Sequence, residues 1–278
     1  MYGLYSPYGG CLSYIYWRAF RLCKAVRWLS VVGEKRLPFP YKEICTANGT
    51  KSKMSFNMGS PGAEQKISIL GFDLQSRQRF FAKYSQKERA RRLTLHEAEI
   101  YRMLGSEGLT PRLLTLKENE GGVYMKAEYI QGRRPESRDI DGDILGVAMK
   151  LGKYHIEPTP AAQHGLQTSL SHGDFCPWNI LVHQGTYRLI DWELAAERPL
   201  GYDLLTYICN VSALFEPKMP LIKKIEENKS WLDKYFSSFQ IQDYSSYLKT
   251  FAHDKAAYER GKQNLTLALP YELLVQDL

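Results

Sequence analysis

The pattern of apolar and polar residues predicts several strands in the first half of the chain. From Lys53 onward the sequence becomes strand-like, and residues 53–59, 65–73 and 77–85 are rich in β-branched and aromatic side chains. Apolar residues at helical spacing follow in residues 89–108. This part of the chain therefore predicts three consecutive strands and then a helix.

The second half of the chain has mainly helical periodicity. Two more strand-like runs, residues 112–116 and 122–130, come first. Residues 140–155 are apolar on one helical side, and residues 204–278 are helical over most of their length. Strands in the first half and helices in the second predict an α+β fold.

One short stretch within the helical half has a different pattern. Ile180–His183 and Thr186–Ile190 are two short strand-like runs joined by a turn at Gln184-Gly185, which predicts a hairpin. His172-Gly173-Asp174 precedes this hairpin, and Asp191 follows it directly.

The polar residues around the hairpin have an order that suits phosphoryl transfer. Asn179 stands five residues after Asp174, immediately before the first strand, and Asp191 ends the second strand. One carboxylate can orient an attacking hydroxyl, while an amide and a second carboxylate hold a magnesium ion on the phosphates. Each motif alone is more often a plain turn or strand end, but their order and spacing together favour the catalytic interpretation.

These residues resemble the catalytic loop and metal-binding strand of the aminoglycoside phosphotransferase and choline kinase families, which are relatives of the protein kinases. Their motifs read HGDxxxxN and then IDW or IDF followed by an acid, as in residues 172–179 and 190–193 here. The resemblance covers residues 54–210. It implies a two-lobed protein-kinase-like fold with a β-rich N-lobe and a mainly helical C-lobe. The domains expected from it are an arm and linker (1–52), an N-lobe (53–130) and a C-lobe (131–278).

The resemblance also implies roles for the polar residues of the predicted C-lobe. Asp174 is expected to orient the acceptor hydroxyl and take its proton, while Asn179 and Asp191 are expected to bind Mg²⁺. His172 and Asp203 are expected to support the catalytic loop.

A strand lysine and a helix glutamate are the corresponding expectations for the N-lobe. Lys83 is expected to contact the phosphates of ATP, and Glu97 to hold Lys83 in place. The position of Glu97 in the EAEIYRML pattern favours it over Glu99.

Two other N-lobe segments are expected to contact the nucleotide. Gly59 and Gly62 bracket a Gly-Ser-Pro-Gly turn, whose backbone could approach phosphate oxygens closely, although a plain turn explains it too. Glu128 and Ile130 lie where the resemblance places the inter-lobe hinge, whose backbone binds the nucleotide base.

The charge of the chain is concentrated at its N-terminal end. The formal net charge is +7, and residues 1–53 carry nine Lys and Arg against two Asp and Glu, so the remainder is neutral. A neutral body argues against a nucleic-acid partner. The five cysteines show no CxxC pair or zinc spacing, which predicts reduced thiols in a cytoplasmic protein. No apolar run of about 18 residues is present to span a membrane.

Residues 12–32 predict an amphipathic helix with one basic face. Four bases occupy one half of it, with Trp17 and Trp28 among them. One interpretation is peripheral contact with an anionic membrane, and the other is a brace packed on the N-lobe. The four bases are Arg18, Arg21, Lys24 and Arg27.

The expected function is transfer of the γ-phosphoryl group of ATP to a hydroxyl of a small molecule. Residues 204–278 hold nine bases and nine acids, which disfavours a polycationic acceptor and favours a sugar, such as one in a cell-surface glycan precursor. A kinase acting on choline, ethanolamine or an aminoglycoside is an alternative. A catalytically silent nucleotide-binding scaffold and a membrane-associated interaction protein are alternatives of another class.

Overall fold

The computed structural model describes residues 40–156 and 165–278. The chain divides into two compact units, one up to Ile130 and the other from Gln131 onward. Residues 12–32, for which an amphipathic helix is predicted, lie outside the described residues.

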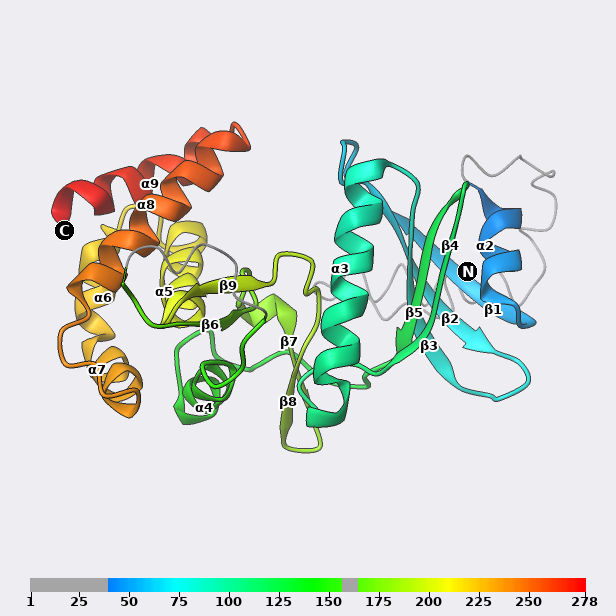
Figure 1. Ribbon diagram of the computed structural model, residues 1–278, viewed down its shortest axis with the longest axis horizontal. Helices are drawn as coiled ribbons and strands as arrows, with labels where there is room; N and C mark the ends of the chain where they lie inside the picture. The colour runs from blue at the N-terminus through cyan, green and yellow to red at the C-terminus, as the bar shows by residue number, and fades with distance from the viewer. Residues whose placement is uncertain (1–39, 157–164) are drawn as a thin grey trace, which may run out of the picture. The chain divides into compact units, whose positions relative to one another are not determined.

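The first unit is built on an antiparallel sheet of five strands (Figure 1). The strand order is β1-β2-β3-β5-β4, so consecutive strands pair except where β5 inserts between β3 and β4. All five strands were predicted from the sequence, with ends that differ by a few residues. They are β1 (Ser52–Met58), β2 (Lys66–Asp73), β3 (Arg79–Ser85), β4 (Leu113–Asn119) and β5 (Gly122–Glu128).

Helices cover both faces of this sheet, with α3 (Glu88–Leu104) on one side and α2 (Tyr41–Asn48) on the other (Figure 1). Side chains of β3 alternate between the two faces, as the pleat of a strand requires. Phe80, Ala82 and Tyr84 pack in the core shared with α2. The intervening residues of β3 face α3, which continues into a short 3₁₀ turn, η3 (Gly105–Glu107).

Helix α2 stands where the sequence predicts only a linker. Ile44 and Ala47 are buried against the sheet, and Asn48 accepts a hydrogen bond of 2.9 Å from the Tyr124 hydroxyl. Gly49, with φ of +70°, ends the helix. A helix of eight residues offers only two turns of periodicity, so its sequence pattern is too short to identify it.

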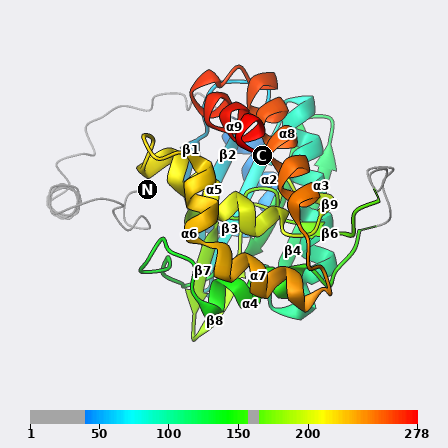
Figure 2. The ribbon, with the colours of Figure 1, turned by 90° about the vertical axis from the view of Figure 1, so that its left-hand side faces the viewer.

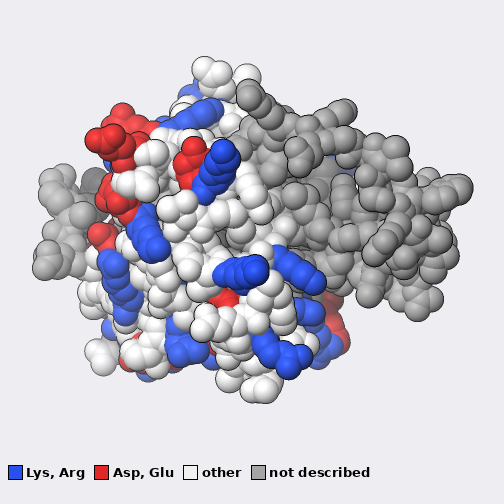
Figure 3. All heavy atoms as spheres, turned by 90° about the vertical axis from the view of Figure 1, so that its right-hand side faces the viewer, with Lys and Arg blue, Asp and Glu red and all other residues white. Residues whose placement is uncertain are grey.

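Several charged side chains of the first unit form ion pairs on its surface. Arg89 pairs with Glu64, and Arg91 pairs with Glu118. Figure 3 shows acidic and basic side chains on one face of the described atoms, with uncharged side chains between many of them.

The second unit contains six helices among the described residues, together with two small two-stranded sheets (Figures 1 and 2). The helices are α4 (Gly142–Leu151), α5 (Tyr202–Phe215), α6 (Leu221–Glu227), α7 (Lys229–Ser238), α8 (Ser245–Gly261) and α9 (Leu265–Asp277). The strand pairs are β6 (Thr168–Ser171) with β9 (Ala196–Pro199) and β7 (Ile180–His183) with β8 (Thr186–Leu189), and η5 (Pro177–Asn179) precedes β7.

Helix α4 is shorter than the predicted helix of residues 140–155. The Asp141 carboxylate caps its N-terminus by accepting hydrogen bonds from the N–H groups of Asp143 and Ile144. The helix ends before Gly152, and His155 lies beyond it, with Nδ1 2.9 Å from Glu197 Oε1. His155 therefore lies outside the helix, with an exposed side chain beside Glu197.

Buried aromatic side chains join α5, α8 and α9 in the second unit. The Tyr202 ring meets the Phe251 ring edge-on at 5.1 Å, and Phe251 meets Tyr271 at 6.0 Å. Helices α8 and α9 lie side by side in Figures 1 and 2. This aromatic core gives the first turn of α5 a firm support. Within residues 40–156 and 165–278, no helix is long and apolar enough to cross a membrane.

Candidate active site

The turn after β6 carries His172-Gly173-Asp174 and requires glycine at its centre. Gly173 has φ of +81°, a conformation that residues with a Cβ rarely adopt. A Cβ at this position would lie 2.3 Å from the Leu194 carbonyl oxygen and 2.6 Å from Arg198 Nη1. The close approach of Leu194 and Arg198 therefore excludes any side chain at Gly173.

His172 connects this turn to the strand that leads to Asp191. Its ring is fully buried, and Nδ1 accepts a 3.3 Å hydrogen bond from the Asp174 N–H. Because Nδ1 is the acceptor, Nε2 carries the proton and donates to the Ile190 carbonyl at 3.0 Å. The ring also packs on Trp192, with centroids 4.6 Å apart. These contacts agree with the supporting position expected for His172.

Asp203 holds the backbone of the same turn from the first turn of α5. Its carboxylate accepts hydrogen bonds from Ser171 Oγ at 2.7 Å, from His172 N at 2.8 Å and from Gly173 N at 3.1 Å. Gly201, rather than Asp203, occupies the N-cap position of α5. Asp203 thus makes the loop contacts expected for it.

Asp174 and Asn179 are joined directly by hydrogen bonds. The Asn179 side-chain amide donates to Asp174 Oδ2 at 2.8 Å and to the Asp174 carbonyl oxygen at 2.9 Å. Since these bonds use the amide nitrogen, the oxygen Oδ1 is the atom that Asn179 can offer to a cation.

The hairpin of β7 and β8 brings Asn179 and Asp191 to the same end. The Ile190 N–H donates to the Asn179 carbonyl at 3.0 Å, so Asp191 follows directly after the residue paired with Asn179. The turn at Gln184 and Gly185, with φ of +48° and +75°, matches the predicted two-residue turn. Asp191 itself has φ of +70°, a conformation uncommon for residues other than glycine. Such strain is often found at functional sites.

The arrangement combines a hydrogen-bonded carboxylate with two oxygen donors of the kind that magnesium prefers. Asp174 can accept a proton, and Asn179 and Asp191 supply an amide oxygen and a carboxylate. The donor set of this segment therefore fits Mg²⁺.

The first unit contains a buried ion pair between a strand and a helix. Lys83 of β3 and Glu97 of α3 are 5% and 0% exposed, and Lys83 Nζ lies 2.5 Å from Glu97 Oε2. Glu99 is exposed on the other side of α3, so Glu97 is the acid that reaches Lys83. The other carboxylate oxygen, Glu97 Oε1, is buried and has no hydrogen-bond partner among the described residues. A buried acceptor of this kind is costly unless a further group satisfies it.

A comparison with protein-family models finds the phosphotransferase enzyme family over residues 154–218. The matched segment contains Asp174, Asn179 and Asp191. The predicted resemblance to phosphotransferases is confirmed. With it, the prediction of an enzyme of the kinase class is also confirmed.

Solved structures of phosphotransferases share the fold of this chain. A choline kinase from Streptococcus pneumoniae is 13% identical, with a TM-score of 0.60, and the match covers 86% of this chain and 98% of that one. An aminoglycoside-3'-phosphotransferase of type VIII is 16% identical, with a TM-score of 0.50 and coverage of 80% and 92%. These likenesses confirm the predicted α+β, protein-kinase-like fold. No curated protein matches the chain.

The glycines predicted to approach phosphates lie in the loop between β1 and β2. The Gly59 N–H donates to the Lys66 carbonyl at 2.9 Å, and a Cβ on Gly59 would lie 2.9 Å from that same oxygen. The Gly62 carbonyl accepts a 2.6 Å hydrogen bond from Lys87 Nζ, at the start of α3. The packing of the turn is sufficient reason for glycine at 59, so the phosphate role of both glycines stays a prediction.

The predicted base-binding residues lie at and beyond the end of β5. The Glu128 N–H donates to the Arg112 carbonyl at 2.9 Å, and the Glu128 carboxylate accepts from Arg112 Nε at 3.3 Å. Ile130 is buried, with 7% of its surface exposed. Any contact with a nucleotide base here must therefore use backbone groups other than the Glu128 N–H.

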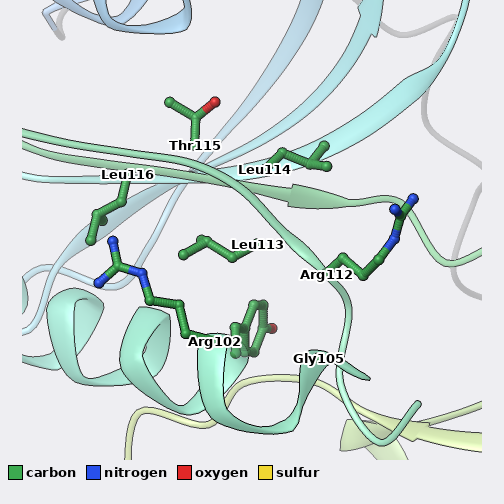
Figure 4. A pocket seen from close by; sticks show the side chains of 8 residues that line it. Arg102, Gly105, Arg112, Leu113, Leu114, Thr115 and Leu116 are labelled. Carbon is green, nitrogen blue, oxygen red and sulfur yellow. The ribbon is translucent and has the colours of Figure 1, made fainter. Parts of the chain in front are cut away.

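A pocket of about 470 Å³ lies elsewhere in the first unit, between the end of α3 and β4 (Figure 4). Arg102 of α3 and Leu113 of β4 line it from opposite sides, and Arg112 lines it farther along the strand. None of the predicted nucleotide-binding residues lines it. The pocket is thus a separate feature of the phosphotransferase fold in this chain.

Cys176 contacts Asp174, a contact that the sequence did not reveal. The thiol is fully buried and donates weakly to Asp174 Oδ1 at 3.5 Å. Burial, and then the neighbouring charge of Asp174, raises the pKa of Cys176 well above its ordinary value, so the thiol stays protonated as a donor. Asn210 donates to Cys176 Sγ and accepts from the Tyr271 hydroxyl, which extends the network to α9. Cys176 is thus part of the packed interior of the second unit.

The sequence also showed no sign of two cations beside the turn of His172-Gly173-Asp174. Arg198 follows the active-site hairpin on β9, and Lys255 lies on α8, about eighty residues from the turn that it contacts. In the sequence, Lys255 stands four residues before Glu259, which is typical of a solvated helix surface. No local pattern could have identified it as buried.

Proposed function

We propose that this chain is a kinase that transfers the γ-phosphoryl group of ATP to a hydroxyl group of a small molecule. The observation that carries this proposal is the direct hydrogen bonding of Asn179 to Asp174, with Asp191 at the same end of the adjoining hairpin. The phosphotransferase family match over these residues supports it independently.

In this proposal, Asp174 orients the acceptor hydroxyl and accepts its proton as the oxygen attacks the γ-phosphorus. The Asn179 amide fixes one carboxylate oxygen of Asp174, which limits rotation of the carboxyl group. Asp203 and His172 hold the backbone on either side, so the base is presented from a rigid turn.

Mg²⁺ is the divalent ion that we propose for this site, held by Asn179 Oδ1 and the Asp191 carboxylate. The ion supplies positive charge to the phosphates when it is bound. In the first unit, Lys83 would bind phosphate oxygens, and Glu97 would keep Lys83 oriented and charged. Gly59 and Gly62 would offer backbone contacts to the phosphates, and the segment from Glu128 to Ile130 would bind the base.

We favour a sugar hydroxyl as the acceptor, such as one in a cell-surface glycan precursor. The equal numbers of acids and bases in residues 204–278 support this choice over a polycation. Choline and aminoglycosides are the acceptors suggested by the names of the similar structures, and they remain the alternative.

Acceptor-dependent release of ADP from ATP, with mass spectrometry of the product, tests the proposal. Neutral sugars, sugar acids, amino alcohols and aminoglycosides form the panel. The proposal predicts a product heavier by one phosphoryl group, formed only when Mg²⁺ and the acceptor are both present. ATP hydrolysis that no acceptor stimulates, together with failure of every acceptor to bind, would contradict it.

We also propose a cytoplasmic protein whose residues 12–32 contact an anionic membrane through Arg18, Arg21, Lys24 and Arg27. Co-sedimentation with anionic vesicles, compared between the full chain and a chain lacking residues 1–36, tests this contact. Binding that is lost on deletion and at high salt supports the membrane role. No binding, with a marked fall in melting temperature on deletion, supports a brace instead.

A further inference from the structure

We propose that Arg198 and Lys255 form an anion-binding subsite beside Asp174, and that the acceptor carries a carboxylate or phosphate group of its own. The inference rests on the proposed phosphotransferase function, because it narrows the substrate class of the same site. It concerns only residues of the second unit.

Arg198 reaches the catalytic turn from β9. Its Nη1 lies close to Gly173, the residue before Asp174. A Cβ added at Gly173 would be 2.6 Å from Nη1. Nη2 donates to the Leu194 carbonyl at 3.2 Å, and the guanidinium carbon stands 4.5 Å from the centre of the Tyr202 ring. Nη1 itself is buried and has no hydrogen-bond partner among the described residues. The guanidinium is therefore held in place by Leu194 and Tyr202 while one buried nitrogen stays unsatisfied.

Lys255 reaches the same turn from α8. The residue is 3% exposed, and Nζ lies 3.5 Å from the Gly173 carbonyl, which is a long hydrogen bond for an ammonium donor. Nζ is also 5.4 Å from the centre of the Tyr202 ring. The two cations thus share Tyr202 and meet at Gly173.

The acids nearby do not form ion pairs with these cations within 4 Å in the described part of the chain. Glu197 of β9 accepts hydrogen bonds from Thr168 Oγ1 and the Ile156 N–H instead. Glu259 on α8 accepts from Asn264 Nδ2 at 3.1 Å. Asp174 is the acid next to Gly173, and its Oδ2 already accepts from Asn179.

A buried ammonium at Lys255, beside a half-buried guanidinium whose Nη1 is buried, is costly to fold without a close carboxylate. Burial, followed by repulsion from Arg198, lowers the pKa of Lys255 from its ordinary value. An apolar side chain of similar length would avoid this cost at position 255. An anionic group bound at Arg198 Nη1 and Lys255 Nζ removes the repulsion and satisfies the unpaired N–H.

The position of the subsite specifies the class of acceptor. Because both cations lie beside the residue that precedes Asp174, an anion held there belongs to the molecule whose hydroxyl Asp174 orients. The class is an alcohol with a neighbouring carboxylate or phosphate, such as a sugar acid or a sugar phosphate. Choline and aminoglycosides, which are cations, would be repelled.

The test compares the melting temperature of the full chain in sodium phosphate and in sodium chloride at equal ionic strength. Mg²⁺ and a non-hydrolysable ATP analogue are present throughout, so that the nucleotide's phosphate positions are filled. Phosphate is expected to raise the melting temperature above the chloride value. Arg198→Gln and Lys255→Met are expected to abolish most of that difference, whereas the exposed control changes Arg260→Gln and Lys249→Met are expected to preserve it.

Glucose, glucuronate and glucose 6-phosphate are then titrated to separate carboxylate from phosphate as the preferred group. Wild type is expected to bind at least one of the two anionic sugars ~10-fold or more tightly than glucose. Arg198→Gln is expected to bring the ratio close to one. Should Lys255→Met fail to fold, Arg198→Gln and Arg198→Lys carry the test, with Arg198→Lys retaining part of the preference because it keeps the charge.

Equal melting temperatures in phosphate and chloride for wild type would overturn the subsite. An equal fall in the melting temperature of Arg198→Gln in both salts would also overturn it, because Arg198 would then stabilise the fold without binding an anion. Failure of the proposed phosphotransferase function would give a different result from failure of the subsite. In that case the ATP analogue itself would not raise the melting temperature of wild type.

Discussion

At the scale of single residues, two hydrogen-bond donors restrain the Asp174 carboxylate. Asn179 donates to one carboxylate oxygen, and the Cys176 thiol donates weakly to the other. If Asp174 is the base, as proposed, this restraint keeps its orientation when the acceptor binds and lowers the entropic cost of reaching the transition state.

Replacing Asp174 with Asn should reduce turnover steeply and leave the fold intact. The side chain keeps its size but loses the ability to accept a proton, and positioned acid–base groups contribute ~10²–10⁴-fold to rate. Turnover of the true acceptor and circular dichroism are the measurements. Asp233→Asn, a change at a surface ion pair on α7, is the control and should be neutral. Wild-type turnover by Asp174→Asn would show that Asp174 is not the base.

Asp73 makes a pH-dependent contribution to the stability of the first unit. A hydrogen bond from the Thr50 side chain, and then one from the Ser76 N–H, lowers the pKa of Asp73 to about 2. The unfolded value is ~3.9, so the stabilisation is fully present above pH 4 and is lost as the pH falls toward 2.

Asp73→Asn should therefore lower the free energy of unfolding at pH 7, by on the order of 1 kcal/mol for the loss of hydrogen bonds to a charged group. Urea denaturation of both proteins from pH 7 to pH 2.5 measures the difference. The two curves should converge in acid. A constant difference across this range would mean that ionised Asp73 contributes nothing specific.

At the scale of elements, α2 belongs to the structural core of the sheet although it precedes the predicted N-lobe. Ile44 is fully buried against the strands. Ile44→Ala should cost about 2–5 kcal/mol of unfolding free energy, because it removes buried methyl groups and leaves a cavity. The exposed neighbour Thr46→Ala should change stability by less than about 0.5 kcal/mol. Equal denaturation midpoints for the two variants would contradict the role given to α2.

The elements also show which parts of the fold a sequence can predict. The five strands, α3 and the β7–β8 hairpin have either long periodicity or a distinctive turn, and all were predicted. Strands β6 and β9 have four residues each, and their paired residues are separated by 24 to 30 intervening residues. A pattern of two alternations carries too little information to identify such a pair.

The same reasoning applies to the candidate site. Asp174, Asn179 and Asp191 lie within 18 residues of sequence, so their spacing predicts their proximity. Lys255 and Arg198 contact the turn through tertiary packing alone, and no spacing predicts that contact. The Lys83–Glu97 pair is intermediate, since only the resemblance to a known family indicated it.

At the scale of the whole molecule, each unit holds one part of the predicted chemistry. The first unit contains the buried Lys83–Glu97 pair, and the second contains the turn with Asp174 and the β7–β8 hairpin. A buried lysine and glutamate are costly to maintain if they serve packing alone, which favours a nucleotide-binding function over an inert scaffold.

Calorimetric titration of ATP into the full chain, with Mg²⁺ and with a chelator, tests the kinase account most directly because it needs no knowledge of the acceptor. Wild type is expected to bind ATP more tightly with Mg²⁺ than without it, and Asp191→Ala is expected to lose that dependence on the metal. Glu99→Gln, an exposed change on α3, is expected to bind as wild type does. Absence of ATP binding by the folded wild type, both with and without Mg²⁺, would contradict the account.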